Sequence, residues 1–365
     1  MITVTKTFLP SLEEYHTLLS GVWERGWVTN EGPLVIELES ALKKYLGVKH
    51  LFFVSNGTLA LQLAIKALNL TGDIITTPFS YVATTSSIVW ENCRPVFVDI
   101  DPDSLCLDPR LIEKAITPTT QAILATHVFG LPCAVEAIEQ IARRYRLRVI
   151  YDAAHAFGVD YDDQSVLNYG DISTLSFHAT KLFHTGEGGA IVTQDDALAK
   201  KIAYMRNCGH VSANQVVGLG INAKNSEIHA ALGLCVLPHV EELIAHRRAL
   251  TALYDALLIP RAIQRPMPSP RAEINYSYYP VLLPSEDHLL IAVNALNQAD
   301  IYPRRYFYPA LTNLPYVAAG ASCPVAESVA SRVLCLPLYH DLQESEVERI
   351  ATIINAHVLG PSLCV

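Results

Sequence analysis

The sequence predicts an α/β fold with a mostly parallel central sheet, followed by a smaller C-terminal α+β domain. Short β-type runs alternate with longer helix-type runs through the first two-thirds of the chain, and helix-type runs dominate from about residue 193. Alternation of this kind is typical of a parallel sheet covered by helices on both faces. Of the 365 residues, 50% are hydrophobic and 17% are charged, a composition that favours a packed core over disorder.

The strand and helix runs follow one another in pairs. The expected strands are "HLFFVSNG" (50–57), "GDIITTPFS" (72–80), "RPVFVDID" (94–101), "TQAILATHVFG" (120–130) and "LRVIYDAA" (147–154). The expected helices after the first four are "TLALQLAIKALNL" (58–70), "YVATTSSIVWENC" (81–93), "DPRLIEKAI" (108–116) and "AVEAIEQIARRYR" (134–146). Residues 176–193 then predict a strand, a glycine-rich turn and a second strand.

Helices are expected at 195–207 and 226–257, before a proline-rich stretch at 259–273 that suggests a domain boundary. A strand at 274–283, a capped helix at 285–299 and a helix at 345–358 complete the chain. We expect a large α/β domain of residues 1–240 and a small α+β domain of residues 241–365.

Charge and cysteine content exclude several classes of protein. The net charge of −9 argues against a nucleic-acid or membrane-surface binder, which needs a basic face. The eight cysteines form no CxxC pair, so no zinc site is predicted, and reduced thiols in a cytosolic protein are expected. Neither a run of about 20 apolar residues nor a signal-peptide pattern is present, so a soluble cytoplasmic protein is expected.

Ligands of such sheets bind beyond the carboxyl ends of the strands, which directs attention to the residues there. In "SNGTLAL", Gly57 and Thr58 open a helix and could seat a phosphate, although an ordinary helix cap is more common. Asp152 in "YDAAHAFG" could cap the next segment or hold a protonated ring nitrogen. Phe79 and Tyr81 follow another strand, where either ring could stack on a flat cofactor or pack in the core.

Lys181 lies within "SFHATKLFHTGEGGAIVT", which has no polar helix face. A lysine near the end of an apolar strand is costly to bury unless it is paired, deprotonated or used covalently. The GxxxxGK[ST] and GxGxxG patterns of phosphate and dinucleotide loops are absent here. Pyridoxal-phosphate catalysis combines a phosphate seat, a flat ring, a pyridinium partner and a lysine nucleophile, and so accounts for all these residues.

Five motifs, in order along the chain, resemble those of the DegT/DnrJ/EryC1/StrS family of nucleotide-sugar aminotransferases. They are "SNGTLAL", "DAAHAFG", "SFHATKLFHTGEGG", "MRNCGH" and "GINAKNSEIHAALG", and the likeness covers nearly the whole chain. The resemblance implies an aspartate aminotransferase-like fold (fold type I), pyridoxal 5′-phosphate as cofactor, and a homodimer with shared active sites.

The resemblance also implies a role for each matched residue. Lys181 would carry the cofactor as a Schiff base and move the proton, and Asp152 would keep the ring nitrogen protonated. The implied cofactor contacts are Gly57, Thr58 and Ser176 at the phosphate, Tyr81 on the ring face, His155 at the ring oxygen, and Asn222 at the phosphate of the neighbouring subunit. The implied substrate contacts are Thr29, Asn30, Glu187, Lys224, Arg305 and Tyr308.

Other roles remain open for several of these substrate contacts. Glu187 could instead brace the turn below the lysine. Lys224 stands where many family members have arginine. Arg305 and Tyr308 could instead pack an aromatic face of the small domain.

Within the family, "WVTNEGPL", "ITTPFSYVAT" and "RRYFYPAL" resemble the transaminases that form dTDP-4-amino-4,6-dideoxyglucose. The implied reaction moves the amino group of L-glutamate to the 4-keto carbon of dTDP-4-keto-6-deoxy-D-glucose, for surface polysaccharide (O-antigen) synthesis. A GDP-linked 4-keto sugar or a 3-keto sugar is the alternative substrate. Lys181 disfavours the related sugar dehydratases, which have histidine there. A non-catalytic regulatory protein on the same fold is the alternative of a different class.

Overall fold

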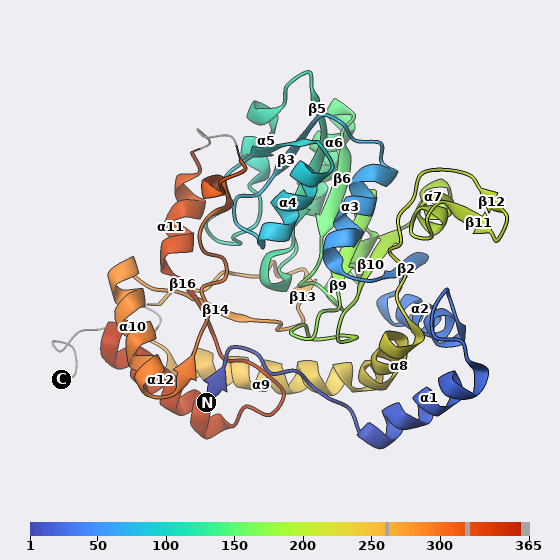
Figure 1. Ribbon diagram of the computed structural model, residues 1–365. Helices are drawn as coiled ribbons and strands as arrows, with labels where there is room; N and C mark the ends of the chain where they lie inside the picture. The colour runs from blue at the N-terminus through green and yellow to red at the C-terminus, as the bar shows by residue number, and fades with distance from the viewer. Residues whose placement is uncertain (260–262, 318–321, 359–365) are drawn as a thin grey trace.

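The computed structural model describes residues 1–259, 263–317 and 322–358, and its centre is a seven-stranded sheet (Figure 1). Both neighbours of β10 run antiparallel to it, and all other neighbouring strands are parallel. The predicted α/β fold with a mostly parallel sheet is therefore confirmed. The strand order is β2 (His50–Val54), β10 (Gly189–Thr193), β9 (Ile172–Ser176), β6 (Arg148–Asp152), β5 (Thr120–Thr126), β3 (Asp73–Thr76) and β4 (Arg94–Phe97).

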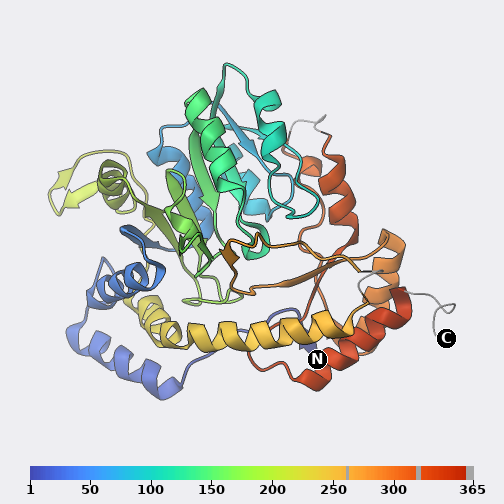
Figure 2. The same ribbon diagram turned by 180° about the vertical axis from the view of Figure 1, so that it is seen from behind.

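Helices cover both faces of this sheet, as the opposite views in Figures 1 and 2 show. Successive strand residues alternate between the two faces, so Ile74 and Ile75 of β3 belong to different buried clusters. The cluster of Ile75, which is the first core, packs against α2 (Pro33–Leu46), α5 (Pro109–Ala115) and α6 (Val135–Tyr145). The other packs against α3 (Gly57–Ala67), α4 (Val82–Trp90) and α7 (Asp196–Met205).

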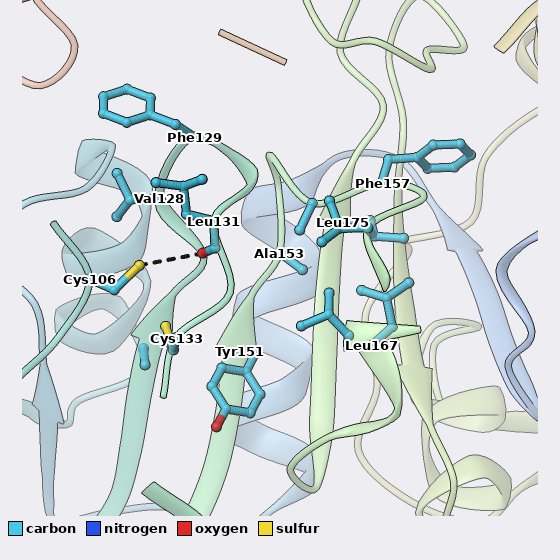
Figure 3. Close-up of a cluster of buried hydrophobic side chains, with 14 of the residues drawn as sticks. Cys106, Val128, Phe129, Leu131, Cys133, Tyr151, Ala153, Phe157, Leu167 and Leu175 are labelled. Carbon is cyan, nitrogen blue, oxygen red and sulfur yellow. Dashed lines mark hydrogen bonds between the residues drawn. The ribbon is translucent and has the colours of Figure 1, made fainter. Parts of the chain in front are cut away.

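Figure 3 shows how one of these clusters fixes the loops that follow β5 and β6. The Tyr151 ring points into the cluster and stacks on His127, with 4.6 Å between ring centroids. The Cys106 thiol donates a hydrogen bond of 3.4 Å to the Leu131 carbonyl oxygen. Because side chains alternate along a strand, Asp152 leaves β6 on the face opposite Tyr151.

A second buried core lies around the C-terminal part of the chain. The long helix α9 contributes to both cores, since Ile244 packs in the first and Leu250 in the second. Ile2 of β1 also lies in the second core. The division of the chain at residue 240 stays a prediction. The elements here are α9 (Val240–Leu257), α10 (Glu286–Gln298), α12 (Glu344–Val358), and the pairs β14 (Tyr279–Leu282) with β16 (Val333–Leu336) and β1 (Ile2–Thr3) with β15 (Ile301–Tyr302).

Helix α8 (Glu227–Val236), the 3₁₀ turn η3 (Leu237–His239) and α9 together form one long apolar helix, Glu227–Leu257, that could span a membrane by length and composition. Val236, Val240 and Tyr254 of this helix are fully buried within the protein. Figure 1 shows it running beneath the central sheet. Because these side chains pack against the rest of the protein, we interpret it as a core helix.

Several of the remaining elements also contribute buried residues to the first core, among them η1 with Val128 and α11 with Ala326. The hairpin of β11 and β12 projects from the body of the protein in both views (Figures 1 and 2). The bounds are α1 (Leu12–Arg25), η1 (Val128–Gly130), β7 (Asp160–Tyr161), β8 (Gln164–Ser165), η2 (Val166–Asn168), β11 (His210–Ser212), β12 (Gln215–Val216), β13 (Ala272–Glu273), η4 (Leu311–Asn313) and α11 (Pro324–Arg332). Of the proline-rich stretch at 259–273, residues 260–262 lie outside the described residues.

Candidate active site

A cavity of about 570 Å³ lies at the carboxyl ends of β3, β5, β6 and β9 and at the start of α3. It is the position where ligands of open α/β sheets bind. The cavity brings together residues that the sequence places far apart. Those predicted as site residues and found in its lining are Gly57, Thr58, Tyr81, Asp152, His155, Ser176, Lys181 and Glu187.

The start of α3 forms one end of this cavity. The Asn56 side chain caps the helix, its Oδ1 accepting a hydrogen bond of 2.8 Å from the Leu59 N–H. A Cβ added to Gly57 would lie 3.0 Å from Ser176 Cβ, so the glycine lets the helix start approach β9 closely. The first-turn N–H groups of Gly57 and Thr58 lack helical partners and can bind an anion.

Asp152 ends β6 with its carboxylate buried in the cavity wall. Its Oδ2 accepts a hydrogen bond of 2.7 Å from the Thr84 hydroxyl, and its Oδ1 accepts one of 3.1 Å from the Ala154 N–H. Burial raises the pKa of Asp152, and these hydrogen bonds and the nearby Lys181 charge oppose the rise. A buried carboxylate of this kind is stabilised by a cationic group, such as a protonated ring nitrogen.

Lys181 lies in the loop between β9 and β10. Its Nζ donates a hydrogen bond of 3.4 Å to the hydroxyl of Tyr278, which also lines the cavity. Protein atoms surround the amine and lower the pKa of Lys181, while the Asp152 charge acts in the opposite direction. A lowered pKa increases the fraction of neutral amine, which is the form that attacks a carbonyl carbon.

His155 is buried and neutral. Its Nδ1 lies 3.2 Å from the Phe129 N–H and accepts a hydrogen bond from it, which assigns the ring proton to Nε2. Burial, with a smaller effect of the Lys181 charge, lowers the pKa of His155 well below its usual value. The ring lies parallel to that of Phe307, at 5.6 Å between centroids and an angle of 6°. His155 can therefore act as a fixed neutral hydrogen-bond donor.

Tyr81 and Glu187 line more open parts of the cavity. The Tyr81 side chain is 59% exposed at the start of α4, so its ring is accessible to a flat ligand. The Glu187 carboxylate lies 3.8 Å from His178 Nε2. The Glu187 backbone carbonyl, by contrast, accepts hydrogen bonds from the Thr185 hydroxyl and the Asn225 amide. The turn is thus braced through the backbone of Glu187, and its carboxylate remains free for other contacts.

Six predicted residues do not line this cavity: Thr29, Asn30, Asn222, Lys224, Arg305 and Tyr308. Lys224 Nζ donates a hydrogen bond of 3.0 Å to Asn222 Oδ1, and Lys224 pairs with Val54 at the end of β2. The Arg305 guanidinium lies 3.5 Å from the Tyr308 ring centroid and forms an ion pair with Glu286 at 2.7 Å. Arg305 and Tyr308 thus contact each other outside the cavity, and their role as substrate contacts stays a prediction.

Sequence reasoning missed several residues in the cavity lining. Arg304, Tyr306 and Phe307 line the cavity in place of Arg305 and Tyr308. Alternation along the backbone could have suggested that one arginine faces inward, but not which one. No sequence signal pointed to other polar lining residues such as Ser80, Thr126, Tyr278, His178 and Thr180, or to Thr84 beside Asp152.

Comparisons with known proteins agree with this geometry. The profile of the DegT/DnrJ/EryC1/StrS aminotransferase family matches residues 12–355. A dTDP-4-amino-4,6-dideoxy-D-glucose transaminase of Shigella dysenteriae is 44% identical, covering 97% of this chain and 98% of the relative. A GDP-perosamine synthase of Caulobacter vibrioides is 33% identical, covering 90% and 91%. The crystal structure of DesI in the presence of its TDP-sugar product aligns with a TM-score of 0.91 at 33% identity, covering 97% and 92%.

The cofactor is pyridoxal 5′-phosphate, as predicted. The cavity fits this group, since it offers a helix start for the phosphate, a buried carboxylate for the ring nitrogen and a lysine whose pKa is lowered. The expected fold type is confirmed by the same structural similarity. The chain belongs to the DegT/DnrJ/EryC1/StrS aminotransferase family.

Proposed function

We propose that this enzyme transfers the amino group of L-glutamate to the 4-keto carbon of dTDP-4-keto-6-deoxy-D-glucose. The product, dTDP-4-amino-4,6-dideoxy-D-glucose, would serve surface polysaccharide synthesis. The observation that carries the proposal is the 44% identity to the Shigella dysenteriae transaminase over nearly the full length of both chains. The lower identity of 33% to a GDP-perosamine synthase favours the dTDP sugar over the GDP sugar.

Different residues around the cavity would bind different parts of the cofactor. The N–H groups of Gly57 and Thr58, with the Ser176 hydroxyl, would bind the phosphate. Asp152 would keep the ring nitrogen protonated, and His155 would donate its Nε2–H to the ring oxygen. The open ring of Tyr81 would stack on the cofactor face. The bound cofactor supplies an electron sink for the negative charge that develops on the substrate carbon.

Lys181 would move the protons of the reaction. In its neutral form, its Nζ would accept the proton released from the α-carbon of glutamate and donate a proton later in the reaction. The Tyr278 hydroxyl, 3.4 Å away, would orient the amine for both transfers. Burial raises the pKa of Tyr278, so the phenol keeps its own proton and acts through a hydrogen bond.

We also propose a homodimer in which Asn222 completes the partner's site. Asn222 and Lys224 lie outside the cavity of their own subunit. The nearby hairpin exposes Val211 and Val216 by 54% and 61%, and Leu219 just after it by 72%, an apolar surface that a second copy would cover. Free thiols at the described cysteines fit the reducing cytoplasm, where we place the reaction.

Mixed dimers test the shared site. Lys181→Ala and Asn222→Ala subunits are refolded together, so that a mixed dimer pairs the intact Lys181 of one subunit with the intact Asn222 of the other. Activity above that of either variant alone supports the shared site. No restoration, with mixed dimers verified by mass spectrometry, would place Asn222 in the site of its own subunit or in neither.

The substrate is tested by incubating the enzyme with L-glutamate and a panel of dTDP- and GDP-linked 4-keto and 3-keto sugars, with NMR of each product. Amination at C4 of the dTDP sugar is expected, and Lys181→Ala is the control that should form no product. Preference for a GDP sugar, or amination at C3, would overturn the substrate. If no sugar is aminated and glutamate does not change the absorbance of the bound cofactor, the chain is a non-catalytic member of its family.

A further inference from the structure

Three buried hydroxyl groups form a chain of hydrogen bonds that ends at Asp152. The Thr126 hydroxyl lies 3.1 Å from the Ser80 hydroxyl, which lies 2.7 Å from the Thr84 hydroxyl. The Thr84 hydroxyl in turn lies 2.7 Å from Asp152 Oδ2. Thr126, Ser80 and Thr84 are at most 3% exposed, so water does not compete for these bonds.

The direction of this chain follows from counting protons. A carboxylate only accepts hydrogen bonds, so the Thr84 proton points to Asp152. Thr84 must then accept from Ser80, and Ser80 must accept from Thr126, because each hydroxyl has one proton to donate. Every proton of the chain is therefore directed toward the carboxylate. The geometry of the Thr126 hydroxyl independently makes it the donor to Ser80, so an ionised Asp152 leaves every hydroxyl proton in the chain with an acceptor, whereas a proton on Oδ2 would leave one hydroxyl of the chain without an acceptor within it.

The chain also fixes where the carboxylate points. Thr126 ends β5, Ser80 lies between β3 and α4, and Thr84 is in the first turn of α4. Together with the Ala154 N–H at 3.1 Å on Oδ1, Thr84 holds both carboxylate oxygens. The Lys181 charge acts on Asp152 and lowers its pKa, and burial, with a smaller effect of the Asp152 charge, raises the pKa of the Cys133 thiol.

We propose that Thr84, Ser80 and Thr126 are positioning residues, which hold Asp152 as an ionised carboxylate aimed at the ring nitrogen of the cofactor. The inference rests on the role proposed above for Asp152. Without the Thr84 proton, the burial of Asp152 favours the neutral acid, which donates a proton instead of accepting one. A neutral acid does not stabilise a protonated ring nitrogen, so the cofactor would be held less tightly.

The experiment measures the affinity of the purified apoenzyme for pyridoxamine 5′-phosphate by calorimetry, because this ligand forms no covalent bond with Lys181. Thr84→Val should weaken binding about tenfold, as expected for the loss of one hydrogen bond to a charged group. Thr84→Ser, which keeps the hydroxyl, should bind within about threefold of the wild type. Thr85→Val is the matched control, because Thr85 is equally buried on α4 and its hydroxyl has no partner among the described residues.

Three further measurements separate the possible failures. Ser80→Ala should weaken binding by less than Thr84→Val, because it acts one hydrogen bond further away. The melting temperature of each apoenzyme shows whether it folds. If Thr84→Val does not fold, the comparison of Thr84→Ser and Ser80→Ala with the wild type still tests the hydroxyl chain. Asp152→Asn should weaken binding at least as much as Thr84→Val. If Asp152→Asn binds like the wild type, the role proposed for Asp152 fails. If Asp152→Asn weakens binding and Thr84→Val matches Thr85→Val, the positioning role of the hydroxyl chain fails.

Discussion

Replacing Gly57 by alanine should damage the phosphate seat through a steric contact that the structure defines. The new Cβ would lie 3.0 Å from Ser176 Cβ and 3.3 Å from Ser176 Cα. Carbon atoms prefer separations of about 3.5–4.0 Å, so α3 and β9 must move apart by roughly 0.5 Å or more. Neither atom belongs to the flexible end of a side chain, so the backbone must shift.

The size of the effect follows from this contact. Inserting a methyl group into a packed site costs about 1–3 kcal/mol. With an unfolding entropy of about 2.1 cal/mol/K per residue, each kcal/mol lowers the melting temperature of a chain of this length by roughly 1–2 °C. The shift also moves the first-turn N–H groups away from Ser176, so we expect the apoenzyme to bind pyridoxamine 5′-phosphate about tenfold more weakly.

Thermal melting and calorimetry of the apoenzyme check both effects. Gly21→Ala is the control, because its Cβ in α1 meets only the flexible Arg25 side chain and alanine favours a helix. In the double variant Gly57→Ala/Ser176→Gly the nearest contact is removed, so the melting temperature should partly recover. A Gly57→Ala variant that melts and binds like Gly21→Ala would refute the steric argument.

Three other predictions concern the cavity wall. Because burial raises the pKa of Asp152, ionisation of Asp152 lowers the stability of the folded protein. The melting temperature of the apoenzyme should therefore fall as the pH rises from about 4 through the raised pKa. The Asp152→Asn variant should show a weaker pH dependence and a higher melting temperature than the wild type at neutral pH. Tyr278→Phe should lower kcat about tenfold with little change in KM, since it removes the partner of the Lys181 amine; an unchanged kcat would exclude the orienting role. Arg304→Ala should raise the KM for the nucleotide sugar, whereas Arg305→Ala should mainly lower the melting temperature, because Arg304 lines the cavity and Arg305 packs on Tyr308; the reverse pattern would return the substrate contact to Arg305.

The sequence determined the features that depend on local patterns. Alternating strand and helix runs predicted the sheet, and the residues just after those runs, such as Asp152 and Lys181, predicted where the site would lie. The sheet is confirmed, and a cavity lined by these residues lies at its edge because the carboxyl ends of parallel strands meet there. The sequence also singled out Gly57 as a phosphate seat at the start of a helix, and the structure adds its close approach to β9.

The tertiary structure decided what depends on contacts between distant residues. Thr84 reaches Asp152 across 68 positions of sequence, and a threonine hydroxyl carries no periodic signal of the partner it will meet. Two adjacent arginines, Arg304 and Arg305, are equivalent in sequence until the backbone turns one into the cavity. Ile2 joins the second core because β1 pairs with β15. Local sequence patterns show which face of a helix or strand is apolar. The hydrogen-bond partner of a polar side chain depends on contacts between distant residues, which form only when the chain folds.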